Sequence, residues 1–145
     1  MMEVMRIIKG SKEKTFAIIL QLVVDDVNRA TKAKMKPEEL KEGYAYTKKL
    51  KPRIGKEANI RVTIEKLHEP VEYEATFLNS QGLNTLSYTL EDHDDTHFKL
   101  VYREAFISDK KSSNMNFSLV SFLYKRSTKK RVNLLLDRLE ELVQE

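Results

Sequence analysis

The first residues of the chain alternate between two apolar sides. Val4 and Ile8 fall on one side of an extended chain. Met5 and Ile7 fall on the other side. This period of two predicts a β-strand over Met2–Lys9.

The segment after this strand has the spacing of an amphipathic helix. Ser11 follows Gly10 and belongs to the residue types that cap helix N-termini. Apolar residues then recur every three or four positions, at Phe16, Ile19, Leu20, Val23, Val24 and Val27. This stripe predicts a helix that extends to about Lys34. Pro37 favours the start of a second, short helix over Pro37–Lys41.

Five segments with alternating apolar and polar residues follow. They are Tyr44–Leu50, Ala58–Leu67, Val71–Asn79, Leu83–Glu91 and His97–Ile107. Their connections are short, as at Ser80–Gly82, and short connections between alternating segments predict an antiparallel meander. One face of such a sheet is buried, and the other faces water.

A long amphipathic helix is expected from about Asn116 to Val143. Its apolar face includes Leu135, Leu139 and Leu142. A sheet with one apolar face must be covered, and this helix has enough apolar length to cover it. We therefore expect a single α+β domain over residues 1–145. It would hold a curved antiparallel sheet of about six strands on the C-terminal helix, with one long and one short helix after the first strand.

The order of these elements resembles a known superfamily. An opening strand that ends at Gly10, a helix begun by Phe16, a strand meander and a C-terminal helix are similar to START-like proteins. These share the helix-grip fold of the Bet v 1 and polyketide-cyclase types. The resemblance covers essentially all 145 residues, and the length and lack of motif resemble an uncharacterised bacterial family of unknown function. It implies a cavity between sheet and last helix that accepts apolar ligands, and it transfers no functional residue.

Composition excludes several kinds of site. The chain has no cysteine, which rules out disulfides, thiol catalysis and cysteine-bound metal sites. The N-terminus lacks the apolar region of a signal peptide. The longest near-apolar stretch, Ala17–Val24, is too short to span a bilayer. We therefore expect a cytoplasmic protein without a transmembrane segment.

Charge is unevenly distributed around a net value of +4. Seven basic residues and no acidic residue lie between Lys110 and Leu136. Acidic residues collect at Glu91–Asp95 and at the C-terminus. Basic segments can bind anionic partners, and the alternative is a solvated surface. Because no nucleic-acid-reading motif accompanies the charge, we expect no specific nucleic-acid partner.

Aromatic residues on the expected inner faces are the first candidates for a ligand cavity. Buried tyrosines need hydroxyl partners, and several of them on one concave face suit an apolar pocket with a few polar groups. The candidates are Tyr46, Tyr73, Phe77, Tyr88, Phe98, Tyr102, Phe117 and Tyr124. The alternative is an ordinary core whose tyrosine hydroxyls reach its rim.

Arg6 and Glu104 each interrupt an apolar strand face and complete the candidate set. If the first and last strands pair, both residues would lie inside, where a mutual ion pair compensates buried charge. The alternative role is a polar anchor for a ligand carboxylate or hydroxyl. Lys48 and Arg131 also interrupt apolar faces, but their long side chains can reach water.

The sequence carries no metal-binding or catalytic motif. His93 and His97 are four residues apart, but they fall in a turn and at a strand start, so we expect a solvated turn there. The signatures of serine hydrolases, zinc proteases and phosphate-binding loops are missing. No cofactor and no catalytic residue are expected, although Glu104 beside Tyr102 would suit acid–base chemistry in a dry pocket.

Three functions therefore stay open. The first is a non-enzymatic module that binds a small apolar or amphipathic molecule between the sheet and the C-terminal helix. The second is a protein-interaction module, or a homodimer, that uses the basic and apolar surface of that helix. The third is a cyclase- or hydrolase-like enzyme. We expect the first, and it requires space between sheet and helix.

Overall fold

The computed structural model describes the backbone of residues 2–50, 58–80, 82–108 and 117–145. Side chains at 50, 58, 108 and 117–128 lie outside this description. The elements in chain order are β1 (Met2–Lys9), α1 (Lys12–Thr31), the 3-10 helix η1 (Pro37–Glu39), β2 (Ala45–Leu50), β3 (Ala58–His68), β4 (Glu72–Asn79), β5 (Gly82–Asp92), β6 (His97–Ser108) and α2 (Phe117–Gln144). The second helix is therefore a single 3-10 turn, shorter than the expected Pro37–Lys41.

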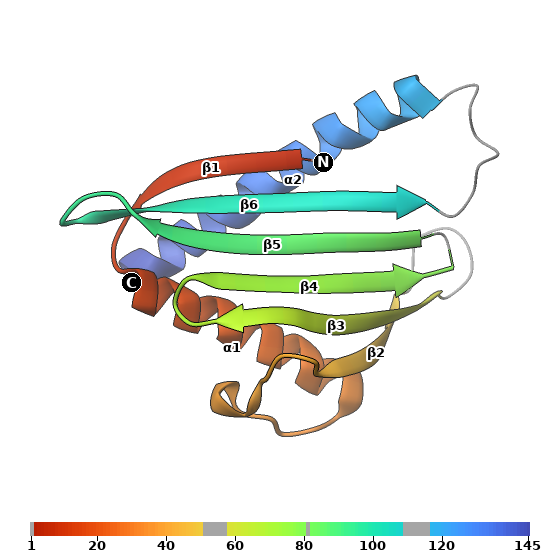
Figure 1. Ribbon diagram of the computed structural model, residues 1–145, viewed down its shortest axis with the longest axis horizontal. Coiled ribbons are helices and arrows are strands. Elements are labelled where there is room, and N and C mark those ends of the chain that lie inside the picture. The colour runs from red at the N-terminus through yellow and green to blue at the C-terminus, as the bar shows by residue number, and fades with distance from the viewer. Residues whose placement is uncertain (1, 51–57, 81, 109–116) are drawn as a thin grey trace.

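The six strands form one antiparallel sheet in the order β1-β6-β5-β4-β3-β2. Strands β2 to β6 are neighbours in chain order, which is the expected meander, and β1 joins the sheet beside β6 (Figure 1). The register sets Val4 of β1 opposite Tyr102 of β6. The first and last strands therefore lie side by side, and β1 forms one edge of the sheet.

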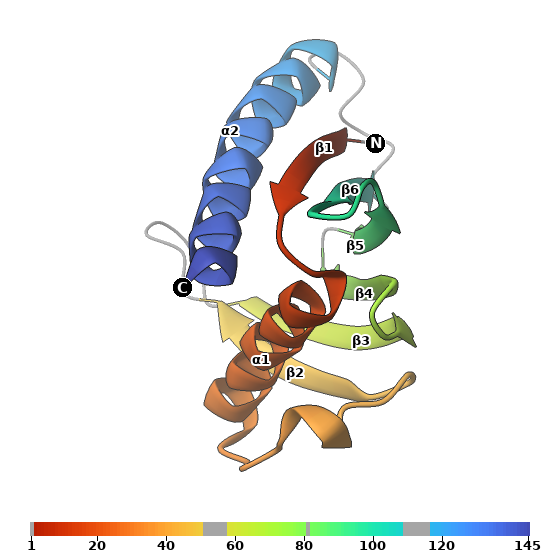
Figure 2. The same ribbon diagram turned by 90° about the vertical axis from the view of Figure 1, so that its left-hand side faces the viewer.

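Both helices lie on the same side of the sheet (Figure 2). We call the sheet face toward them the inner face. On β1, Val4 and Ile8 point to this face and are buried. Met5 and Ile7 point the other way and are 57% and 43% exposed. The core lies between sheet and helices, so the α+β helix-grip fold expected from the sequence is confirmed.

Helix α1 begins where the sequence predicts and ends earlier. The Ser11 hydroxyl accepts a hydrogen bond from the Lys14 backbone N–H at 3.1 Å, so Ser11 is the N-cap. The helix ends at Thr31, before the expected position. Lys32 adopts a left-handed conformation with φ of 62°, and its N–H donates to the Asn28 carbonyl. This backbone geometry stops the helix, although glycine is the residue that usually provides it.

Helix α2 presents a continuous apolar stripe to the core. From residue 129 onward, where its side chains are described, the buried residues are Val132, Leu136, Leu139 and Val143. The stripe differs from the expected one, because Leu135 and Leu142 are only half-buried and Leu139 alone is shared. Within the described part of the chain, no helix is long and apolar enough to cross a membrane.

Candidate functional site

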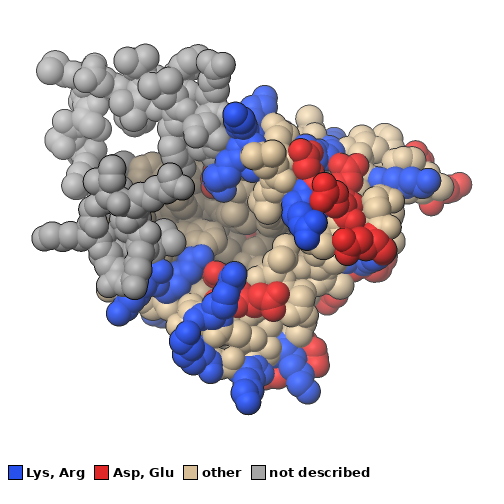
Figure 3. Space-filling model, turned by 180° about the vertical axis from the view of Figure 1, so that it is seen from behind, with Lys and Arg blue, Asp and Glu red and all other residues tan. Residues whose placement is uncertain are grey.

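The inner face is tightly packed at one end and partly accessible at the other. Near the connection from β1 to α1, Leu90, Phe98 and Leu100 are at most 2% exposed. Where β2, β4 and β6 finish, inner-face residues keep accessible surface. This open end comprises Phe77, Asn84, Leu86, Tyr88 and Phe106. Figure 3 views the helix side of the molecule and shows a hollow toward the same end, with Lys and Arg side chains at its border.

Three tyrosines cross the inner face in direct register beside the open end. Tyr88 on β5 lies opposite Tyr73 on β4 and Tyr102 on β6. The ring centroids are 6.3 Å apart for Tyr73 and Tyr88, and 5.3 Å apart for Tyr88 and Tyr102. Burial raises the pKa of all three hydroxyls above the usual range. Tyr88 nevertheless keeps accessible surface, as expected of a residue that borders an internal space.

The tyrosines give a pH-dependent prediction. Burial raises the pKa of Tyr46, Tyr73, Tyr88 and Tyr102 well above 10 in the folded protein. The unfolded chain therefore ionises first, and stability that is fully present below pH 10 is lost as the pH rises above it. A titration followed by tyrosinate absorbance should show fewer than six ionised tyrosines until the protein unfolds, and all six in concentrated urea. Ionisation of all six near pH 10 in the native protein would contradict this burial.

Glu104 is a largely covered carboxylate whose charge is compensated. Its side chain is 11% exposed, and Arg131 Nη2 on α2 lies 3.2 Å from Oε1. The Tyr102 hydroxyl donates a longer hydrogen bond, 3.4 Å, to the same oxygen. Strand β6 and helix α2 thus meet through a polar cluster that consists of Tyr102, Glu104 and Arg131.

The expected ion pair between Arg6 and Glu104 is wrong. The register sets Met2, and not Arg6, opposite Glu104. Four residues along a strand correspond to roughly 13 Å, which is too far for a direct contact. Arg6 instead lies against α2, with Nη1 at 2.6 Å from Asp137 Oδ1 and 3.5 Å from Glu140 Oε2. Both intruding charges therefore find partners on the helix, and Arg6 fastens α2 to the edge strand.

A second polar cluster lies on the α1 side of the inner face. The Tyr46 hydroxyl donates to Asp26 Oδ2 at 2.5 Å, and Lys48 Nζ lies 3.1 Å from the same oxygen. Lys48 Nζ is also 5.7 Å from the centroid of the Phe77 ring, a cation–π distance. Asp26 was not a sequence candidate. It borders the apolar stripe of α1 next to Val27, and this position could have identified it as a residue close to the inner face.

The ten candidate residues do not all lie at the open end. Phe98 belongs to the packed core and Arg6 to the fastening of α2, so neither lies at the open end. The side chains of Phe117 and Tyr124 lie outside the described residues. The candidates that stay on the inner face at or near the open end are Tyr46, Tyr73, Phe77, Tyr88, Tyr102 and Glu104.

Asn84 is an inner-face residue that the sequence reasoning missed. It lies opposite Phe77 on β4 and Phe106 on β6. Among the described residues, its Oδ1 is a buried side-chain atom without a hydrogen-bond partner. An unsatisfied buried acceptor lowers the free energy of unfolding by about 1–3 kcal/mol. Alternation already places Asn84 on the same strand face as Tyr88. A polar residue on that apolar face is the same signal that identified Arg6 and Glu104.

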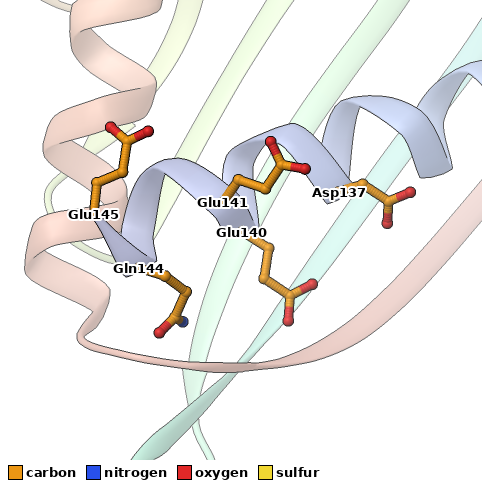
Figure 4. A pocket seen from close by; sticks show the side chains of 5 residues that line it. All are labelled: Asp137, Glu140, Glu141, Gln144 and Glu145. Atoms are coloured by element: carbon orange, nitrogen blue, oxygen red, sulfur yellow. The ribbon is translucent and has the colours of Figure 1, made fainter.

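Two surface pockets lie away from the open end. One has a volume of about 400 Å³ on the last turns of α2 and is shown in Figure 4. It is lined by Asp137, Glu140, Glu141, Gln144 and Glu145. A second, of about 550 Å³, lies between Gly10–Glu13 and the turn before β6, and Phe98 is its one candidate residue. Because Arg6 already binds Asp137 and Glu140, the first is an ion-paired surface.

The turn before β6 is built by Asp94. Its Oδ1 accepts hydrogen bonds from the backbone N–H groups of Thr96 and His97, at 2.9 and 2.7 Å. The Thr96 N–H is the main reason why the pKa of this carboxyl falls to about 2. Within the described residues, no three His, Asp or Glu side chains are grouped as a metal site would require. The acidic segment therefore has a structural explanation in a hydrogen-bonded turn.

Comparison with known proteins identifies the fold. A family model described as "Domain of unknown function (DUF3284)" matches residues 2–125. No curated protein matches the chain. The structure is similar to that of a protein of unknown function from Staphylococcus aureus, SA2116, with a TM-score of 0.68 and 14% identity over 99% of this chain and 92% of that one.

Two further solved structures share the architecture. CV1439 from Chromobacterium violaceum and Ara h 8.0201 each have a TM-score of 0.65 and 12% identity. Each alignment covers 99% of this chain and 96% of the other. At these identities the likeness shows the fold alone, and that fold is the Bet v 1-like, helix-grip fold of the START-like resemblance.

Proposed function

The chain belongs to the DUF3284 family, whose description assigns no activity, and from the geometry we propose that it binds a small apolar or amphipathic molecule between the sheet and α2. The observation that carries this proposal is the open end. Aromatic and aliphatic side chains there point toward the helices and yet keep accessible surface, beside the hollow in Figure 3. Interior side chains pack closely, so accessible apolar surface on the inner face is surface on which a ligand could add contacts.

The chemistry of the surrounding wall supports the same proposal. Ligand pockets are mostly apolar and carry a few polar groups that orient the ligand. Phe77 and Leu86 supply apolar surface at the open end, and Tyr88 supplies a hydroxyl. The cluster of Glu104 and Arg131 adds charge on one side. This combination suits a molecule with a large apolar part and a small polar part.

The contacts of Glu104 favour binding over the enzymatic alternative. A general acid or base must reach the substrate proton with a free oxygen. Glu104 Oε1 already accepts hydrogen bonds from Tyr102 and Arg131, and Arg131 Nη2 also lies 3.4 Å from Oε2. The carboxylate is therefore placed to hold the arginine, which is a positioning role.

A neutral fluorescent probe tests the proposal directly. N-phenyl-1-naphthylamine should bind the native protein saturably, with increased fluorescence. Leu86→Trp fills the open end and should weaken binding about tenfold or more, the usual effect of losing one well-packed contact region. Leu78→Trp is the matched control, because Leu78 is 49% exposed on the outer face of the neighbouring strand. Absence of saturable binding, or equal effects of the two substitutions, would overturn the proposal.

A further inference from the structure

We propose that the bound molecule is an amphipathic anion whose carboxylate-type head group is held by Arg131 and the Tyr88 hydroxyl, with its apolar part along Phe77 and Leu86. This inference rests on the proposed function and names the ligand class for the same site. Three observations on the described residues carry it: the spare donors of the exposed Arg131 guanidinium, the accessible side chain of Tyr88, and the contacts that already occupy Glu104.

Arg131 has unused hydrogen-bonding capacity. Only its Nη2 contacts Glu104, at 3.2 Å from Oε1 and 3.4 Å from Oε2. A guanidinium group has five N–H donors, and the bonds to Glu104, together with a side-chain hydrogen bond to Tyr102, leave some of them for another acceptor. The side chain is 58% exposed, so these donors are accessible. Glu104 therefore fixes one nitrogen of a group whose planar fork matches the two oxygens of a carboxylate.

Tyr88 adds a second donor beside this cluster, because its ring centroid lies 5.3 Å from that of Tyr102, whose hydroxyl donates to Glu104. Burial is the main cause of its raised pKa, and the nearby Arg131 charge partly offsets that rise. The phenol is therefore neutral at physiological pH and keeps its proton to donate. No described residue accepts that proton, whereas the Tyr102 hydroxyl has Glu104. Tyr88 keeps accessible surface, so its hydroxyl can turn toward a ligand oxygen and donate to it.

The charges around this position favour an acceptor with negative charge. Glu104 is already engaged by Tyr102 and Arg131, so it offers a ligand little. Lys129 and Lys130, both exposed, precede Arg131 on α2 and leave the group with excess positive charge. Asn84 does not compete with a ligand as an acceptor for these donors, because its Oδ1 lacks accessible surface. A neutral alcohol would use the Tyr88 donor and leave the guanidinium donors to water.

Calorimetric titration with dodecanoate and dodecan-1-ol separates head group from tail, because the two share a chain and differ in charge. The native protein should bind dodecanoate about tenfold or more tightly than the alcohol, as expected for charge-assisted hydrogen bonds. Arg131→Gln should remove most of that preference and leave alcohol binding within about twofold. Tyr88→Phe should weaken dodecanoate binding several-fold. Arg138→Gln removes the same charge farther along α2, where the partner is Glu141, and should leave the preference intact.

Each result decides the inference. If acid and alcohol bind equally and Arg131→Gln changes neither, the head-group assignment is wrong, while the proposed apolar site stands. If neither compound binds, the proposed function itself fails. Should Arg131→Gln not fold because Glu104 loses its partner, the double variant Glu104→Gln/Arg131→Gln keeps the pair neutral. It should bind the alcohol normally and the acid weakly, and retained acid preference in it would equally overturn the assignment.

Discussion

Replacement of Leu136 by alanine is expected to lower the free energy of unfolding by about 2–5 kcal/mol. Leu136 has no exposed surface and lies in the buried stripe of α2. The substitution removes buried methyl groups and leaves a cavity between the helix and the sheet. Urea denaturation followed by circular dichroism measures the change, provided that the transition is two-state and the denaturant slope is unchanged.

Leu134→Ala is the matched control for this prediction. Leu134 lies two positions earlier on the same helix but is 62% exposed. The chemical change is identical, and we expect an effect within about 0.5 kcal/mol. Equal losses at the two positions would mean that α2 does not cover the sheet with the Leu136 side, and the assignment of the inner face would have to be abandoned.

The second large effect is expected at Gly10, where β1 passes into α1. Its φ of 139° is a conformation that residues with a side chain rarely adopt. A Cβ at this position would lie 2.7 Å from Val143 Cγ1 of α2, closer than real contacts allow. Gly10→Ala therefore combines backbone strain with overpacking, and we expect a loss of about 2–5 kcal/mol in thermal or urea unfolding.

A double-mutant cycle distinguishes these two causes. Val143→Ala removes the methyl group that the new Cβ would meet, but it leaves the backbone conformation of Gly10 unchanged. The double variant should be less destabilised than the sum of the single variants, by about 0.5–3 kcal/mol. Strict additivity would show that the close approach to Val143 contributes nothing and that backbone strain explains the whole loss.

The strands could be predicted from the sequence because their signal is local. Alternation in β1 placed Val4 and Ile8 on one side of the strand, and the structure buries both. Short connections predicted the antiparallel order of β3 to β6, which the sheet has. The end of α1 was less predictable. Lys32 takes a left-handed conformation without being glycine, and a lysine at this position does not indicate the end of a helix.

The partners of the charged residues could not be predicted, because they depend on how α2 is rotated. Leu134, Leu135 and Leu136 are consecutive, so several faces of this helix are apolar enough to cover a sheet. Only tertiary packing selects the face with Leu136, and that choice places Arg131 beside Glu104. Sequence reasoning found Glu104 as an inner-face charge correctly, yet assigned it a partner on a strand.

The contact between Arg6 and α2 has a consequence for association of the chain with itself. An edge strand offers unpaired backbone groups, and stacking of such edges leads to open-ended aggregation. Arg6 lies near the middle of β1 and holds Asp137 and Glu140, so it keeps the last turns of α2 close to this edge. The Gln144 side chain also donates to the Lys9 carbonyl at 2.6 Å and occupies one of those backbone groups. The end of α2, anchored by Arg6, thereby occupies part of the edge through which another copy could pair.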